Sequence, residues 1–250
     1  MWKDRKISVI FPTYAESRSV RMAIEQALET GVVDEVIVIN NNAEPGTSEE
    51  IAKTSAREVF EVKQGYGHAI RRGLAEARGD LIIVSEPDGT FAGADIMKLL
   101  AYAGDFPVVF GTRTCTSLFA RNEHANMSMA IRYGNVAVAK LIEVLFNAST
   151  LTDVGCTMRL FDRKAVLQVM PACRSGGSDF GLELMLAVIT SGIRWIQIPV
   201  FYKPRVGKSS VTGDIKKAVM LGLCMFTLVV RMRARTTVRL RRRNQVLSEV

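Results

Sequence analysis

The sequence has few of the residues that bind zinc or build disulfide frameworks. Only two histidines occur among 250 residues, and the four cysteines are scattered with no Cys-x-x-Cys pair. This scarcity argues against a zinc site and against a small, disulfide-stabilised secreted protein. We therefore expect the protein to work in a reducing compartment.

The sequence also lacks an apolar run near its C-terminus that is long enough to cross a membrane. Residues 218–230 are thirteen uncharged positions, whereas a helix that spans ~30 Å of hydrocarbon needs about 20. Lys216 and Lys217 precede this run, and seven arginines follow it. Basic flanks of this kind are typical of a helix that lies in the interface of an anionic membrane. A helix of the protein core is the alternative interpretation.

Positive charge is concentrated at the C-terminal end. Of the net charge of +8, residues 218–250 carry +6 and residues 1–217 carry +2. A basic block binds nucleic acid or an anionic membrane, but no nucleic-acid motif accompanies this one. The first residues enter a strand-like run without the longer apolar segment of a signal peptide. We expect a folded domain over 1–217, a membrane-interface helix and basic tail over 218–250, and a peripheral protein on the cytoplasmic face of a membrane.

Strand and helix signals alternate along most of the chain. Strands are predicted at 7–11, 36–39, 58–62, 81–84, 108–111 and 194–199. Helices are predicted at 19–28, 68–78, 95–103, 131–146 and 181–189, with a further helix that starts at a capping box of Thr47 and Glu50. The repeated strand–loop–helix order predicts an α/β protein with a mostly parallel, doubly wound sheet flanked by helices.

Two carboxylates follow the predicted strand at 81–84. Its four apolar residues fit a strand that is buried on both faces of a parallel sheet. Ligands of open α/β sheets bind at the carboxyl ends of such strands. Because Pro87 fixes φ between Glu86 and Asp88, both side chains can point at one hard cation, Mg²⁺ or Mn²⁺. An ordinary polar turn is the alternative.

Gly65 and Gly67 precede the helix predicted at 68–78. The free N–H groups and the dipole of a helix N-terminus favour anions, so these glycines are candidates for a phosphate cradle. They lack the dinucleotide-binding fingerprint, and a tight turn from strand to helix explains them equally well.

Several short motifs, spread in one order over residues 7–209, resemble those of the family 2 glycosyltransferases of the GT-A fold. Within that family they are most similar to the dolichol-phosphate mannose synthase-like enzymes, which glycosylate polyprenyl phosphates. The matching segments are FPTYAE (11–16), VINNNAEPGT (38–47), KQGYGHAIRRGLAEARGD (63–80), EPD (86–88), FGTR (110–113), LTDVGCTMRLF (151–161) and KPRVGKS (203–209).

The resemblance implies roles for individual residues. The nucleotide base and ribose would be held by Pro12, Tyr14 and Glu16. Asp88, helped by Glu86, would hold Mg²⁺ or Mn²⁺ on the diphosphate. The acceptor phosphate would be surrounded by Arg113, Arg132 and Arg205. The remaining candidates for substrate binding are Asn40, Asn41, Gly67, Asn135 and Ser209.

Asn40 and Asn41 depart from the family pattern, which has carboxylates at these positions. The ribose or base contact therefore loses its charge, and both GDP-mannose and a UDP-sugar stay open as donors. Glu86 is one methylene longer than the first carboxylate of the family motif, so Asp88 is the stronger metal candidate.

The implied reaction displaces a nucleoside diphosphate from a sugar with inversion, and a divalent cation offsets the charge of the leaving group. A phosphate monoester has a second pKa near ~6, so it is largely dianionic at neutral pH. Such an acceptor needs cations more than a base, and arginine matches phosphate bidentately.

Two other functions stay open. Transfer to a glycan hydroxyl would need a base, for which Asp179 and Glu183 are candidates one helical turn apart. The missing acidic pair at residues 40–41 leaves a non-catalytic protein that binds nucleotide sugars as the second alternative. A separate membrane partner also stays open.

Overall fold

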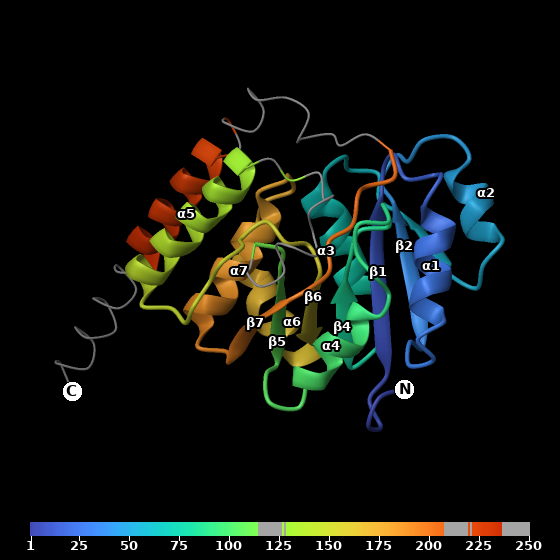
Figure 1. The fold of residues 1–250 in the computed structure, drawn as a ribbon, viewed down its shortest axis with the longest axis horizontal. Coiled ribbons are helices and arrows are strands. Elements are labelled where there is room, and N and C mark those ends of the chain that lie inside the picture. The colour runs from blue at the N-terminus through green and yellow to red at the C-terminus, as the bar shows by residue number, and fades with distance from the viewer. Residues whose placement is uncertain (115–126, 128, 208–219, 221, 237–250) are drawn as a thin grey trace.

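A seven-stranded sheet forms the centre of the protein in the computed structural model, which describes residues 1–114, 127, 129–207, 220 and 222–236 (Figure 1). The strand order is β3-β2-β1-β4-β6-β5-β7. The strands are β1 (Ile7–Thr13), β2 (Glu35–Asn40), β3 (Arg57–Phe60), β4 (Leu81–Val84), β5 (Val108–Thr112), β6 (Arg159–Asp162) and β7 (Trp195–Pro199). All pairings are parallel except those of β6, which runs antiparallel to β4 and β5.

Helices cover both faces of the sheet (Figure 1). They are α1 (Val20–Leu28), α2 (Thr47–Ala52), α3 (Tyr66–Glu76), α4 (Asp95–Tyr102), α5 (Met129–Phe146), α6 (Arg163–Val169), the short 3₁₀ helix η2 (Met170–Ala172) and α7 (Phe180–Ser191). One core cluster joins the sheet to α3, α5, α6 and α7, and the other joins the opposite face to α1, α2 and α4. The two clusters take alternate residues of each strand, as the pleat requires. The predicted mostly parallel α/β sheet is confirmed.

The apolar run of β4 lies between β1 and β6, and all four of its side chains are buried. Such burial on both faces explains why these residues do not alternate with polar ones. The chain turns polar at Ser85, at the same edge of the sheet where β1 and β2 end. Glu86 and Asp88 therefore lie beside the segments that follow β1 and β2.

The C-terminal helix, residues 222–236, packs beside α5 (Figure 1). Its inward face buries Val229 and Met232 in the same core cluster as α5 and α7. Its outward face exposes Leu223, Phe226 and Val230. The helix is thus amphipathic. One face packs into the protein core, as the core-helix alternative predicts, and the other face is exposed. In the described part of the chain, no helix combines the length and apolar character that crossing a membrane requires.

Two elements were missed at the level of the sequence, and one helix start was predicted wrongly. The antiparallel strand β6 and helix α6 were not predicted, because β6 has only four residues and its apolar run is too short to show a period. The capping box at Thr47 does not form. Gly46 is the N-cap of α2 instead, and the Thr47 hydroxyl donates to the carbonyl of Glu44.

Candidate active site

Asp88 presents one carboxylate oxygen without a hydrogen bond in the described chain, just after β4. Its side chain is buried, and Oδ1 accepts hydrogen bonds from the amide of Thr90 at 2.9 Å and the hydroxyl of Thr90 at 2.6 Å. Oδ2 is buried and accepts no hydrogen bond among the described residues. Thr90 therefore fixes the rotation of the carboxylate and leaves Oδ2 available to a cation.

Arg205 approaches this oxygen from the late loop, residues 200–207. Its Nε lies 3.1 Å from Asp88 Oδ2, and its Nη2 donates to Glu16 Oε1 at 3.1 Å. The other oxygen of Glu16 accepts the amides of Tyr14 and Ala15. Glu16 is thus bound within the protein at both oxygens, whereas the resemblance implied a nucleotide contact.

Glu86 is partly exposed beside this ion pair. Loss of surrounding water and the neighbouring Asp88 carboxylate raise the pKa of Glu86 to about 8, although Arg205 and Arg113 oppose the rise. Two carboxylates that share one site cannot both ionise freely without a counter-ion. A divalent cation would supply that counter-charge.

Two carboxylates, those of Glu86 and Asp88, fit a Mg²⁺ or Mn²⁺ ion whose other ligands are substrate phosphates and water. No group of three or more His, Cys, Asp or Glu side chains that could hold a metal occurs among the described residues. Mg²⁺ is commonly bound through one or two carboxylates and completed by substrate phosphates and water. The unsatisfied Oδ2 of Asp88 is the observation that supports this fit.

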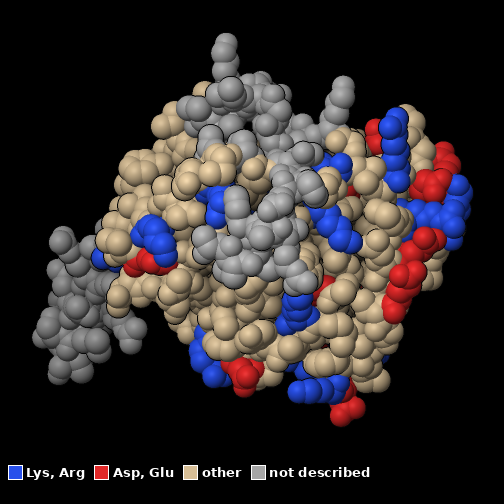
Figure 2. Space-filling view, in the orientation of Figure 1, with Lys and Arg blue, Asp and Glu red and all other residues tan. Residues whose placement is uncertain are grey.

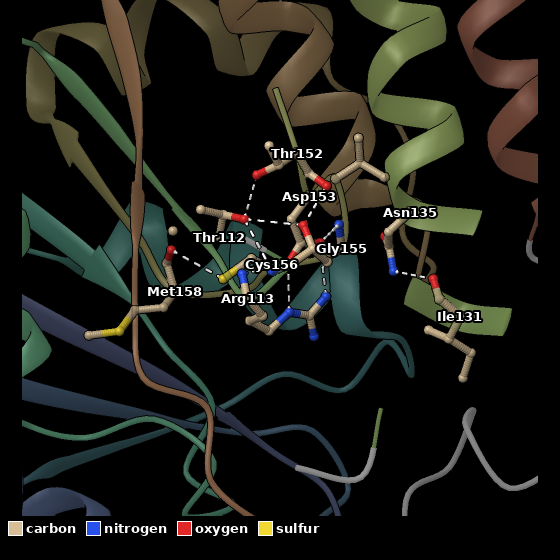
Figure 3. Close-up of polar contacts among 12 residues, drawn as sticks. Thr112, Arg113, Ile131, Asn135, Thr152, Asp153, Gly155, Cys156 and Met158 are labelled. Atoms are coloured by element: carbon tan, nitrogen blue, oxygen red, sulfur yellow. Dashed lines mark hydrogen bonds and ion pairs between the residues drawn. The ribbon is translucent and has the colours of Figure 1, made fainter. Parts of the chain in front are cut away.

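A second buried ion pair lies at the end of β5. Arg113 donates from its Nε to Asp153 Oδ2 at 2.8 Å and from its Nη2 to Oδ1 at 3.0 Å, so the pair is bidentate (Figure 3). Asp153 also accepts the amides of Arg113 and Gly155. Burial opposes its ionisation, but the Arg113 guanidinium outweighs burial and holds the pKa of Asp153 below its usual value. Arg113 is therefore fixed in a single orientation.

Asn135 of α5 meets Arg113 at Gly155 (Figure 3). A Cβ on Gly155 would lie 2.8 Å from Asn135 Oδ1 and 3.0 Å from Arg113 Nη2. The side-chain amide of Asn135 donates to the backbone carbonyl of Ile131. Arg132, three residues before Asn135 in the same helix, is partly exposed. The structure thus brings Arg113 and Asn135 together, and α5 contributes to the site.

Arg159 of β6 is a cationic residue that the sequence did not single out for a role. It is buried, and its guanidinium donates to the carbonyls of Cys156, Val154 and Gly181. These three partners are neutral carbonyls, and burial lowers the pKa of Arg159. Only the position of Arg159 in the motif at 151–161 could have pointed to it.

Asn40 and Asn41 are both engaged within the protein. Asn40 donates to Ser48 and Glu58 and accepts the amide of Ala43. Asn41 donates to the carbonyls of Glu61 and Lys63 and accepts the amide of Gly65. The two amides tie the end of β2 to the chain after β3. Amide side chains allow this, because a carboxylate cannot donate.

Gly67 makes room for another part of the chain. Its amide, and that of His68, donate to the carbonyl of Gly176, and a Cβ on Gly67 would lie 2.7 Å from the Cβ of Phe180. The N-terminus of α3 therefore binds a carbonyl of its own chain where a phosphate cradle was expected. The tight-turn interpretation accounts for Gly67 through this close packing.

Most of the other candidates also have places in the described chain. Pro12 is buried within β1, and Tyr14 is exposed just beyond it. Glu183 is nearly buried and accepts the amides of Arg174 and Ser175, and Asp179 accepts the hydroxyl of Ser175. Ser209 lies outside the described residues.

Comparison with solved structures identifies the fold. The protein is similar to a crystal structure of glucosyl-3-phosphoglycerate synthase from Mycobacterium tuberculosis in complex with Mn²⁺, uridine diphosphate and phosphoglyceric acid. The TM-score is 0.73 at 16% identity, and the match covers 92% of this chain and 79% of that chain. The sheet is therefore that of the GT-A fold, as predicted.

The chain belongs to glycosyl transferase family 2, whose family model matches residues 8–169, and it is therefore a glycosyltransferase. It is 26% identical over 215 residues to the low-salt glycan biosynthesis hexosyltransferase Agl6 of Haloferax volcanii, which covers 82% of this chain but only 49% of that protein. It is 23% identical over 206 residues to a dolichyl-phosphate hexose transferase of the same organism, across 82% of this chain and 86% of the relative. The expected family is confirmed.

Proposed function

We propose that the protein transfers a sugar, with inversion, from a nucleoside-diphosphate sugar to a polyprenyl phosphate with the help of Mg²⁺ or Mn²⁺. The observation that carries the proposal is the buried Oδ2 of Asp88 at the edge of the sheet, which accepts no hydrogen bond among the described residues and is faced by Arg205. An acidic pair beside cationic side chains suits a reaction whose two substrates both bear phosphate. The relative named a dolichyl-phosphate hexose transferase supports a lipid-phosphate acceptor.

Metal, donor and acceptor would divide the site between them. Asp88 and Glu86 would hold the cation, which supplies Lewis-acid stabilisation of the departing diphosphate. Arg113, held by Asp153 and with its guanidinium carbon 5.1 Å from the ring of Tyr202, would bind the acceptor phosphate together with Asn135, Arg132 and Arg205. Tyr14 and Pro12 would contact the base. A fixed arginine binds without further loss of conformational freedom.

The state of the candidate bases favours a phosphate over a hydroxyl acceptor. Glu183 is nearly buried, and one of its oxygens accepts two backbone amides. Asp179 is bonded to the hydroxyl of Ser175 in the same loop. A dianionic phosphate needs no such base at neutral pH. This leaves Asp179 and Glu183 with the role of shaping the loop that contacts α3.

The apolar surface beside α5 supports action at a membrane. Leu223, Phe226 and Val230 of the C-terminal helix are exposed, as are Tyr133 and Val144 of α5. On the face drawn in Figure 2, charged side chains crowd the α1 and α2 end, while fewer of them appear on the surface toward α5. Exposed arginines follow the apolar face along the C-terminal helix. This combination suits binding to an anionic lipid surface.

A transfer assay tests the proposal. Radiolabelled UDP-sugars and GDP-mannose are each incubated with undecaprenyl phosphate or dolichyl phosphate, in Mn²⁺, Mg²⁺ or EDTA, and label is counted in the organic phase. We expect one donor to give a lipid-linked product that EDTA abolishes. Asp88→Asn should abolish it as well.

The control acceptor is the polyprenol of the same length, which lacks the phosphate group. It should receive no sugar, because its hydroxyl has neither the charge nor the proton state that the arginines select. Equal transfer to polyprenol and polyprenyl phosphate would contradict the proposed acceptor. Transfer only to a glycan, lost in Asp179→Asn, would favour the hydroxyl alternative.

A further inference from the structure

A glutamine in the last strand bonds to the backbone beside the buried ion pair. Gln197 lies in β7, which follows β5 at the end of the sheet. Its side-chain oxygen accepts the amide of Thr152 at 2.7 Å and the amide of Asp153 at 3.3 Å. Its side-chain NH₂ donates to the carbonyl of Asp153 at 2.6 Å and to that of Gly111 at 3.2 Å. Gln197 therefore holds the backbone of Asp153 at both its N–H and its carbonyl.

Two threonines attach the same segment to the end of β5. The hydroxyls of Thr112 and Thr152 share a hydrogen bond at 2.7 Å, and the hydroxyl of Thr114 donates to the carbonyl of Thr152 at 2.6 Å (Figure 3). Thr112 and Thr114 flank Arg113 in the chain. The segment that carries Asp153 is thus fixed between β5 on one side and Gln197 of β7 on the other.

The bonds of Gln197 need a side chain that both donates and accepts. A primary amide has an acceptor oxygen and two donor hydrogens, whereas a carboxylate only accepts and a methionine of similar length offers neither. A carboxylate at this position would also add a negative charge near the pair of Arg113 and Asp153. A buried backbone group that loses its partner costs free energy. The segment would therefore shift towards other partners, and the carboxylate of Asp153 would shift with it.

We infer that Gln197 is a positioning residue for the acceptor phosphate. It holds Asp153, and Asp153 holds the guanidinium of Arg113 through the bidentate pair. A binding group works best when surrounding hydrogen bonds keep it in one geometry. The inference rests on the proposed function, because it takes from there the phosphate as the group that Arg113 binds. It adds a residue that lies outside all the matching motifs.

Transfer kinetics with a short, water-soluble prenyl phosphate test the inference. Gln197→Met should raise the KM for the prenyl phosphate about tenfold, a difference that corresponds to ~1.4 kcal/mol. The kcat and the KM for the donor should stay close to those of the wild type. A merely structural role would lower the fraction of active enzyme, so kcat would fall while both KM values stayed unchanged. That result would overturn the inference.

A double-mutant cycle shows whether Gln197 acts through Arg113. Arg113→Lys already removes the bidentate pair, so adding Gln197→Met should raise the KM for the prenyl phosphate little further. If the two effects multiplied, Gln197 would act independently of Arg113 and the inference would fail. The matched control is Gln168→Met. Gln168 of α6 donates to the carbonyl of Ser191 in an exposed position, and its replacement should leave the KM unchanged.

A second measurement needs no substrate and covers the case in which Gln197→Met does not fold. Gln197→Glu keeps the size and the acceptor oxygen but cannot donate. The Nε–Hε resonance of Arg113 in a ¹H–¹⁵N spectrum is assigned by its loss in Arg113→Lys. It should be resolved from those of exposed arginines in the wild type and move towards them in Gln197→Glu. An unchanged resonance would overturn the inference. Failure of the wild type to use any prenyl phosphate would instead remove the acceptor of the proposed function, whatever this spectrum shows.

Discussion

Replacement of Asp153 by asparagine should cost about 3–5 kcal/mol of unfolding free energy. The side chain of Asp153 is fully buried and accepts four hydrogen bonds, three from Arg113 and one from Gly155. Asparagine keeps the size but removes the charge and turns one acceptor into a donor. Arg113, which is only 11% exposed, would be left without its counter-ion, and breaking a buried pair on one side costs this much.

Urea denaturation at pH 7, followed by circular dichroism, measures this cost. Glu25→Gln is the control, because Glu25 pairs with Arg21 on the exposed side of α1 and an exposed pair contributes less than about 1 kcal/mol. The slope of the transition should stay unchanged in both variants. A loss below 1 kcal/mol in Asp153→Asn would refute the reasoning.

The effect of Asp153→Asn on the unfolding free energy should depend on pH. The pKa of Asp153 is lowered in the folded protein by Arg113, so its stabilising contribution is present above the unfolded pKa of about 3.9 and is lost as the pH falls through the folded value. The difference in unfolding free energy between wild type and Asp153→Asn should therefore shrink below about pH 4. A difference that grew on acidification would contradict the assignment.

Three further changes test other parts of the account. Asp88→Ala should lower turnover by about 10²-fold or more without loss of fold, because a bound cation stabilises the transition state by several kcal/mol. Wild-type rates in this variant would contradict the metal site. Gly67→Ala should destabilise the protein by about 1–3 kcal/mol in urea, because its Cβ would lie 2.7 Å from the Cβ of Phe180, and an unchanged midpoint would count against that packing. Phe226→Asp should weaken binding to anionic vesicles several-fold in a sedimentation assay. The vesicles should also protect the exposed Cys224 from aqueous maleimide, and equal labelling with and without vesicles would argue against a lipid-facing helix.

Much of the fold could be predicted because its signals are local. The apolar run of β4 and the helical stripes each lie within a few consecutive residues, so the sequence displays their period directly. The position of Glu86 and Asp88 followed from where β4 stops. Strand β6 gave no comparable signal, and its antiparallel direction depends on partners far away in the chain.

The contacts that complete the site could not be predicted from local patterns. Arg205 meets Glu16 across 189 positions of the chain, and Arg113 meets Asp153 across 40. The order of the motifs singled out Arg113 and Arg205 as site residues, but it did not predict which carboxylates they pair with. The engagement of Asn40 and Asn41 within the protein likewise depends on the folded chain after β3.

The central claim is that the acidic pair after β4 holds a divalent cation on a nucleoside diphosphate. Crystals grown with Mn²⁺ and the bound nucleoside diphosphate, measured at a wavelength where manganese scatters anomalously, test it directly. The account predicts an anomalous peak in contact with Asp88 Oδ2 and the diphosphate. A manganese peak elsewhere, or a diphosphate bound away from Asp88, would contradict it.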